Sequence, residues 1–307
     1  MTNKSESRII VLGRVSMALT VNLDSVPKPK EQITAKRITY IPGGKGSNQA
    51  VAANKLGGKA SFVTCIGADK FGADLLSFLK SQGLDTSFIK TSKDTQTGTS
   101  IVMIDNNSDN TIISIPGSER ELHPSDMHQI KFNKGDIAVT QLALAEEVLT
   151  KFLKKAKDSK ATTILNCAPQ NKVSKDLLKL ADYIILNERE AAFFAGNMAV
   201  SQNHLVALDY AKKIRLREDQ VIVVTLGSKG SVTLNGHEVI RIPGIKVDAI
   251  DTTGAGDTFV GAFATALSES MGLKQGLSFA NKAAALCVQK HGAATSAPTR
   301  KEVDDMK

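Results

Sequence analysis

Short apolar runs recur along the chain, and segments with the apolar spacing of helices separate most of them. Six runs predict buried strands, at Ile9–Leu12, Phe62–Ile66, Ile137–Thr140, Thr163–Leu165, Tyr183–Leu186 and Val221–Thr225. Helical patterns follow most of these runs, at Phe71–Ser81, Glu146–Lys157, Leu205–Ile214 and Gly276–Gln289. Because such alternation is typical of strands covered on both faces, it predicts an α/β fold with a mostly parallel central sheet flanked by helices.

Two segments break this rhythm and predict short strands joined by turns. Ile101–Ile104 and Thr111–Ile115 flank the turn-forming residues 105–110, a pattern that predicts a β-hairpin. The other segment, from Val15 to Ile41, carries prolines compatible with edge strands. We expect residues of about 14–41 and 97–116 to form a small β-sheet lid on a single domain spanning 1–307.

The composition narrows the class of protein. The low aromatic content, with no Trp, argues against a base-stacking nucleic-acid platform. The net charge of +8 comes from Lys and Arg spread along the chain, which indicates a solvated surface that attracts anionic substrates rather than nucleic acid. No signal peptide and no apolar run of membrane-spanning length is present, so we expect a cytoplasmic protein without a membrane partner. Cys65, Cys167 and Cys287 are isolated, which indicates buried, reduced thiols.

The stretch Asp251–Phe259 carries the clearest chemical signal. Gly254, Ala255 and Gly256 directly precede a helical pattern, so they bring unpaired backbone N–H groups to a helix N-terminus, a site suited to a phosphate. Asp257 places a carboxylate beside them. A base next to a phosphate site suits the attack of a hydroxyl on a phosphoryl group. The alternative is a tight turn whose Asp only complements the helix dipole.

A second glycine-rich stretch, Gly43–Asn48, precedes an Ala-rich helical segment, Gln49–Leu56. Lys45 and Asn48 offer donors to hydroxyls or phosphates. The order of residues fits neither a Walker A loop nor a GxGxxG motif. A glycine-rich turn without a ligand is the alternative.

Two further stretches follow predicted strands, at the sheet edge where α/β proteins bind ligands. Asn187 and Glu190 could orient a metal-bound water or a phosphate, or they could only cap a helix. Thr225–Gly230 could wrap nucleotide phosphates, or form a hairpin turn. His291 is expected to be an ordinary loop residue.

Taken in order, these four stretches resemble the PfkB carbohydrate kinase family, in its ribokinase-like branch. Further matches are Gly67-Ala68-Asp69 with Gly72, Thr97-Gly98, and Asn166 with Ala168-Pro169. The resemblance runs from about Gly13 to Pro298.

The resemblance implies a kinase that transfers phosphate from ATP to the primary hydroxyl of a sugar, ribose to ribose 5-phosphate, with Mg²⁺ and K⁺. It implies a role as base for Asp257 and an anion hole at Gly254, Ala255 and Gly256. The implied sugar contacts are Gly44, Lys45, Asn48 and Ser16. The implied ATP contacts are Asn187, Thr225, Gly227, Gly230 and Asn281. Glu190 would hold Mg²⁺ through water, and the implied monovalent-cation positions are Asp251, Thr253, Cys287, Lys290, Gly292 and Ser296.

The chain departs from the family pattern on the sugar side. Ser16 and Ala18 stand where the family usually has a sugar-binding Asn and Asp, and Ala143 stands where ribokinase-like members have a Glu. Each lost charged hydrogen bond costs on the order of 1.5–3 kcal/mol, so two would weaken ribose binding roughly a hundredfold or more.

Three hypotheses remain open. The chain phosphorylates ribose through other contacts, or it phosphorylates another sugar or a nucleoside, or it is a sugar or nucleotide sensor without catalysis. The intact Asp257 argues against the sensor. A projecting sheet with exposed edges also predicts a homodimer through the lid.

Overall fold

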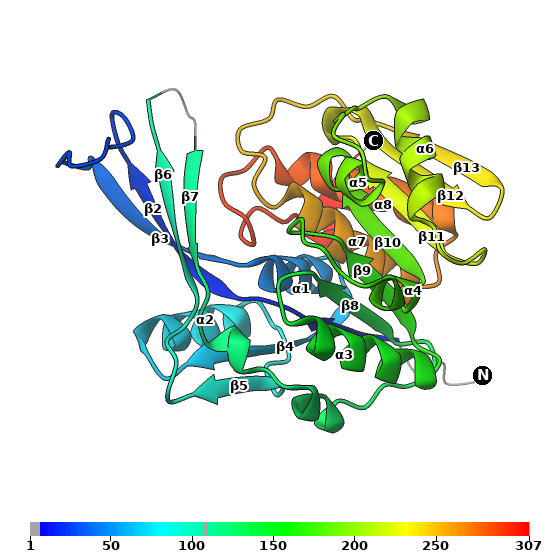
Figure 1. Cartoon of the computed structure of the whole chain (residues 1–307), viewed down its shortest axis with the longest axis horizontal. Coiled ribbons are helices and arrows are strands. Elements are labelled where there is room, and N and C mark those ends of the chain that lie inside the picture. The colour runs from blue at the N-terminus through cyan, green and yellow to red at the C-terminus, as the bar shows by residue number, and fades with distance from the viewer. Residues whose placement is uncertain (1–6, 107–109, 307) are drawn as a thin grey trace.

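The computed structural model describes residues 7–106 and 110–306 of the chain. Within them, nine strands form one large sheet in the order β13-β12-β11-β10-β9-β8-β1-β4-β5 (Figure 1). Neighbouring strands from β5 to β11 are parallel, and β12 and β13 add an antiparallel edge. The strands are β1 (Arg8–Leu12), β4 (Lys59–Gly67), β5 (Ile89–Ser92), β8 (Ile137–Gln141), β9 (Thr162–Asn166), β10 (Tyr183–Asn187), β11 (Val221–Thr225), β12 (Gly230–Asn235) and β13 (Glu238–Pro243). The predicted parallel sheet is confirmed.

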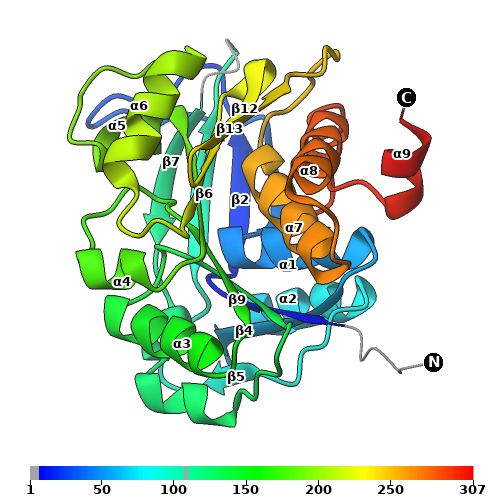
Figure 2. The same ribbon diagram turned by 90° about the vertical axis from the view of Figure 1, so that its right-hand side faces the viewer.

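Helices cover both faces of this sheet, as predicted (Figure 2). One face carries α1 (Lys45–Lys55), α2 (Lys70–Ser81), α7 (Ala255–Ser268) and α8 (Leu273–Cys287). The other carries α3 (Glu146–Asp158), α4 (Lys175–Lys179), α5 (Glu188–Phe194) and α6 (His204–Ile214). A further helix, α9 (Arg300–Asp305), contacts α8, and 3₁₀ helices lie at Ser118–Glu121, Pro124–Gln129 and Gly227–Lys229.

Alternate residues of the central strands supply the two cores. In β1, Ile9 and Val11 join the core under α1 and α7, whereas Ile10 and Leu12 join the core on the side of α3. Successive strand side chains point to opposite faces, so a sheet covered on both sides needs an unbroken apolar run. This is the physical reason that the strands were visible in the sequence.

Helices α1 and α7 approach each other closely because small residues line their contact. A Cβ on Gly261 of α7 would lie 2.5 Å from the Gln49 carbonyl oxygen and 2.8 Å from the Ala52 Cβ. Thr265 also donates a hydrogen bond from Oγ1 to the Ala53 carbonyl at 3.1 Å. The close packing brings the start of α1 against the start of α7, and these two helix ends carry the two glycine-rich stretches.

A separate four-stranded sheet, in the order β3-β2-β6-β7, projects from the main body (Figure 1). Its strands are β2 (Ser16–Asn22), β3 (Arg37–Gly43), β6 (Thr99–Ile104) and β7 (Asn110–Ile115). The predicted hairpin of β6 and β7 is confirmed, although residues 107–109 of its turn lie outside the described residues. The other predicted segment, from Val15 to Ile41, extends two residues further than expected, to Gly43. The reason is that β2 and β3 stay paired up to the start of α1.

The structure bears on the predicted absence of a membrane span and on the state of the three cysteines. Among the described residues, no helix has both the length and the apolar character needed to cross a bilayer. Cys65, Cys167 and Cys287 are buried and unpaired, as predicted.

Candidate active site

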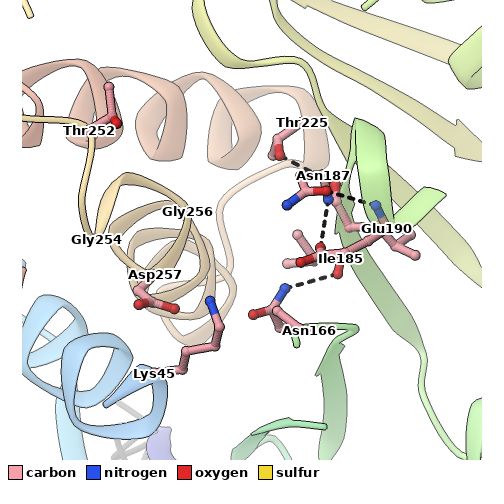
Figure 3. Close-up of a pocket in the computed structure, with 12 residues that line it drawn as sticks. Lys45, Asn166, Ile185, Asn187, Glu190, Thr225, Thr252, Gly254, Gly256 and Asp257 are labelled. Atoms are coloured by element: carbon pink, nitrogen blue, oxygen red, sulfur yellow. Dashed lines mark hydrogen bonds between the residues drawn. The ribbon is translucent and has the colours of Figure 1, made fainter. Parts of the chain in front are cut away.

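A cavity of about 210 Å³ lies at the carboxyl ends of β9, β10 and β11, beside the N-terminus of α7 (Figure 3). All four sequence stretches contribute to its wall. The lining residues are Lys45, Asn166, Ala168, Ile185, Leu186, Asn187, Glu190, Thr225, Thr252, Gly254, Gly256 and Asp257. The carboxyl edge of a parallel sheet is where α/β folds bind ligands, so the fold brings the separate stretches to one place.

Asp257 lies in the first turn of α7 and is buried. Its carboxylate accepts a hydrogen bond from Asn48 Nδ2 at 2.8 Å and another from Gln49 Nε2 at 3.0 Å. Two amide donors stabilise the ionised form of a carboxylate, which is the form that takes up a proton. The geometry is therefore compatible with a general base.

The backbone at the start of α7 requires glycine at one position and leaves room at another. Gly254 is the N-cap residue with φ of 80°, and a Cβ there would lie 2.9 Å from the Ala293 Cα. A Cβ on Gly256 would meet no atom within 4 Å. The first N–H groups of a helix have no partner within the helix. In α7 the Ala255 N–H donates to the Thr252 carbonyl at 3.3 Å, so the N–H of Gly256 is the donor that this helix end offers to an anion in the cavity.

Lys45 is the first residue of α1, and its side chain extends into the space between Asp257 and Asn166 (Figure 3). Gly44, the N-cap, has φ of 99°, and a Cβ there would lie 2.6 Å from the Arg14 carbonyl oxygen. The glycine-rich turn thus has a structural reason as well as a ligand-facing side chain. Ser16 is buried at the start of β2, and neither it, Gly44 nor Asn48 lines the cavity.

Asn187 and Glu190 form a capping box at the start of α5. Asn187 Oδ1 accepts hydrogen bonds from the backbone N–H groups of Arg189 at 2.9 Å and Glu190 at 2.8 Å, and Glu190 Oε2 accepts from the Asn187 N–H at 2.9 Å. The helix-capping alternative is therefore confirmed, yet both residues also line the cavity. Burial raises the pKa of Glu190 to about 6, against hydrogen bonding from Asn187 and the charge of Lys45, which lower it.

Three predicted nucleotide contacts lie outside the cavity lining. Gly227 and Gly230 shape the turn between the antiparallel strands β11 and β12, so this stretch does form a hairpin. Gly230 has φ of 88°, and a Cβ there would lie 2.0 Å from the Ile242 carbonyl oxygen. Asn281, on α8, donates from Nδ2 to the Pro243 carbonyl at 2.9 Å. Thr225, in contrast, lines the cavity.

The predicted cation positions converge on the loops that flank α7 and α8. Asp251 accepts hydrogen bonds from the N–H of Thr253 at 2.9 Å and of Gly292 at 3.0 Å. Burial opposes ionisation of Asp251, but these hydrogen bonds hold its pKa below the ordinary value. Cys287 Sγ lies 3.1 Å from Ser296 Oγ, and the Lys290 side chain turns outward to Glu302 at 2.5 Å. The fold thus gathers these positions, except for the side chain of Lys290.

Gln49, Gln141 and Asn166 were not predicted as site residues. Hydrogen bonds join their side chains to one another and, through Gln49, to the Asp257 carboxylate. A signal for two of them was present. Gln141 and Asn166 are polar residues at the carboxyl ends of buried strands, where α/β proteins place ligand-facing groups.

Comparison with known proteins gives consistent matches over nearly the whole chain. The family profile described as "pfkB family carbohydrate kinase" matches residues 6–300. Ribokinase of Bacillus subtilis (strain 168) is 34% identical over 302 residues, covering 97% of this chain and 98% of that protein. The crystal structure of ribokinase from Thermotoga maritima is 31% identical with a TM-score of 0.84, covering 97% and 98% of the two chains. The structure of Arabidopsis thaliana ribokinase complexed with ribose and ATP is 29% identical with a TM-score of 0.86, covering 97% of each chain.

Proposed function

The chain belongs to the pfkB carbohydrate kinase family and is an ATP-dependent sugar kinase, and on this premise we propose that it phosphorylates the primary hydroxyl of ribose to give ribose 5-phosphate. The observation that carries the proposal is the arrangement around Asp257. A buried carboxylate, held by two amide donors, lies beside the open N-terminus of α7 in a cavity that also holds Lys45. The carboxylate of Asp257, the N-terminus of α7 and the charged side chain of Lys45 thus face the same cavity.

In the proposed reaction, the acceptor hydroxyl oxygen attacks the terminal phosphorus of ATP while its proton moves to Asp257. The new oxygen–phosphorus bond forms as the bond to ADP breaks. We propose that the N–H groups at Gly254, Ala255 and Gly256 stabilise the charge on the transferring group, because donors placed where charge develops favour the transition state. The Ala255 N–H would have to leave the Thr252 carbonyl, to which it donates at 3.3 Å, to take part. Lys45 adds a positive charge at the same place.

Asn48 supports the acceptor side of the proposal. Its Nδ2 is used by Asp257, whereas its buried Oδ1 has no hydrogen-bond partner among the described residues. A buried, unpartnered oxygen is destabilising unless a ligand satisfies it. We propose that it accepts from a sugar hydroxyl, although Asn48 does not line the cavity itself. Gly44, which lies against the Ser16 backbone, and Ser16 are proposed to adjoin that hydroxyl.

The residues also fit a magnesium ion at Glu190. In the described part of the chain no cluster of three or more His, Cys, Asp or Glu side chains is placed to hold a metal. Mg²⁺ commonly binds through one carboxylate, waters and substrate phosphates, and the buried Glu190 beside the phosphate site offers such a carboxylate. The ion, when bound, neutralises phosphate charge. Asn187, Thr225, Gly227, Gly230 and Asn281 would face the nucleotide.

The oxygen atoms near Asp251 fit K⁺ less directly than Glu190 fits Mg²⁺. Both oxygens of Asp251 already accept hydrogen bonds, so the ion would rely on carbonyl oxygens of the loops as well. We propose a K⁺ position near Asp251, Thr253, Cys287, Gly292 and Ser296, with the backbone of Lys290 contributing.

A second acceptor is favoured by one observation. Ala143 lines another cavity, of about 280 Å³, whose wall combines the apolar side chains of Leu122, Leu144 and Val148 with the charged Glu119 and Arg120. This cavity shares no lining residue with the one at Asp257. Because Ala18 and Ala143 replace acidic residues that would bind ribose hydroxyls, we propose a nucleoside or a modified sugar as the second acceptor.

We also propose that the four-stranded sheet is a lid that pairs two copies of the chain. Ile38 and Tyr40 of β3 and Ile113 and Ile115 of β7 are 45–55% exposed. The strand register places all four on one face, together with Leu19. Exposed apolar patches of this kind mark interfaces.

The experiment that tests the function is an ATP-consumption assay over pentoses, deoxyribose, hexoses and nucleosides, with K⁺ present or replaced by choline. Turnover of ribose at low concentration supports the first proposal, and preference for a nucleoside supports the second. No turnover with any acceptor would contradict both and favour a sensor.

A further inference from the structure

Three side-chain amides form a continuous hydrogen-bonded chain behind Asp257. Gln49 Nε2 donates to Asp257 Oδ1 at 3.0 Å and to Asn166 Oδ1 at 3.1 Å. Gln141 Nε2 donates to Gln49 Oε1 at 2.7 Å, and Asn166 Nδ2 donates to the Ile185 carbonyl at 3.1 Å. Gln49 and Gln141 are fully buried, so water does not compete for these bonds. The chain links α1, β8, β9 and β10 to the first turn of α7.

The charge of Asp257 sets the direction of every bond in this chain. An ionised carboxylate only accepts hydrogen bonds, so Gln49 must turn its nitrogen toward Asp257 and its oxygen away. Gln141 must then present its nitrogen to that oxygen. The second hydrogen of Gln49 goes to Asn166, which leaves the Asn166 nitrogen for the Ile185 carbonyl. Each amide therefore has one orientation that satisfies its neighbours.

Gln141 is not explained by fold stability alone. Its Oε1 is buried and has no hydrogen-bond partner among the described residues. The same oxygen lies where a side chain at Gly13 would begin, since a Cβ there would be 2.1 Å from it. A buried, unpartnered carbonyl destabilises a fold, so packing alone favours an apolar residue such as Met. The fold instead keeps an amide whose side chain, within residues 7–106 and 110–306, hydrogen-bonds to Gln49 alone.

We propose that Gln49 and Gln141 are positioning residues for the phosphoryl transfer. Gln141 fixes the orientation of Gln49, and Gln49, together with Asn48, holds the carboxylate of Asp257 fixed in direction. The inference rests on the proposed function of Asp257. The amide chain itself transfers no proton. The acceptor proton ends on Asp257, and the amide donors act by keeping that oxygen in place.

The test is Gln141→Met, because this residue reaches Asp257 only through Gln49. Gln220→Met is the matched control. Gln220 is also fully buried and donates to the carbonyls of Leu178 and Ala181, both at 2.8 Å, but it lies at the amino end of β11, away from the cavity.

We expect Gln141→Met to lower kcat by on the order of 10- to 100-fold, the effect of a slightly misplaced catalytic group. KM for ATP should not change. Gln220→Met should lose stability but keep the wild-type kcat. Equal kcat values in the two variants would overturn the proposal.

A second variant, Gln49→Glu, keeps the size of the side chain but removes both donated hydrogens. It should lower kcat more than Gln141→Met does. If the wild-type chain phosphorylates no acceptor, the proposed function fails, and the amide chain is tested by side-chain amide NMR. The Gln49 resonance, assigned by its loss in Gln49→Glu, should shift and exchange faster in Gln141→Met and stay unchanged in Gln220→Met. An unchanged Gln49 resonance in Gln141→Met would overturn the amide chain itself.

Discussion

Glu190 should make the free enzyme less stable as the pH rises, and the substitution Glu190→Gln should remove this effect. The Glu190 side chain is 6% exposed, and burial raises its pKa from the ordinary 4.5 to about 6. Folding therefore favours the protonated carboxyl. The stability that this preference contributes is fully present below pH 4.5 and is lost as the pH rises through about 6.

The magnitude follows from the two pKa values. One pKa unit corresponds to about 1.36 kcal/mol, so the difference between 4.5 and about 6 amounts to about 2 kcal/mol. Gln has no charge at any pH, and its side-chain oxygen can still accept the hydrogen bond from the Asn187 N–H. Glu190→Gln should therefore raise the free energy of unfolding by about 2 kcal/mol at about pH 7.5 and leave it unchanged below about pH 4.5.

The assay is urea unfolding of both proteins between about pH 4.5 and 8, without nucleotide and with a chelator. A variant that is no more stable than the wild type at about pH 7.5, or a difference that does not grow with pH, would refute the reasoning. If Glu190 holds Mg²⁺ as proposed, adding Mg²⁺ and ATP should stabilise the wild type more than the variant, because ligand binding to the folded state adds to its stability. The gain in stability would then be paired with a loss of turnover.

Three further predictions concern the same molecule. Asp257→Asn should lower kcat by about 10²- to 10⁴-fold, the usual contribution of a general base, while ATP binding measured by calorimetry is kept; near-normal turnover would contradict the base assignment. Gly254→Ala should lower the free energy of unfolding by about 1–3 kcal/mol, because φ is 80° and a Cβ would lie 2.9 Å from Ala293. Gly256→Ala, where a Cβ meets no atom within 4 Å, should keep the free energy of unfolding within about 0.5 kcal/mol of the wild type. If thermal unfolding showed equal losses of stability for Gly254→Ala and Gly256→Ala, this account of the turn would be ruled out. Ile113→Lys on the exposed face of the four-stranded sheet should shift a dimer toward monomer in light scattering, whereas a wild-type protein that is monomeric at all concentrations would exclude the proposed pairing.

The sequence was informative wherever a pattern depends on near neighbours along the chain. The apolar runs became strands because both faces of the sheet are covered, and the i, i+4 spacing at Phe259 and Phe263 became a buried helix. Glycines before helices marked turns whose φ is positive, as at Gly44 and Gly254. These features predicted the parallel arrangement and six strands of the main sheet, most of its helices, the small sheet and the four stretches around the cavity.

Some side chains had two roles that the sequence could not separate. Asn187 was a candidate ligand or a helix cap, and the structure shows that its oxygen caps α5 while the residue lines the cavity. Gly227 and Gly230 were candidate phosphate contacts or turn residues, and the structure shows that they form the turn between β11 and β12. Only the positions of the neighbouring atoms reveal such a structural role.

By itself, the sequence determined six strands of the main sheet, most of the helices that cover it and the acidic residue that starts α7, because these follow from periodicity and from local turn chemistry. Strands β5, β12 and β13 and the short helices α4 and α9 were not predicted. The tertiary structure decided what surrounds that residue. Gln49 lies 208 positions from Asp257 in the chain and 3.0 Å from it in the fold, and Gln141 reaches it through one further hydrogen bond. No periodic pattern records such a contact, because it depends on how closely α1 and α7 pack, and that closeness depends on small residues such as Gly261 where the two helices meet.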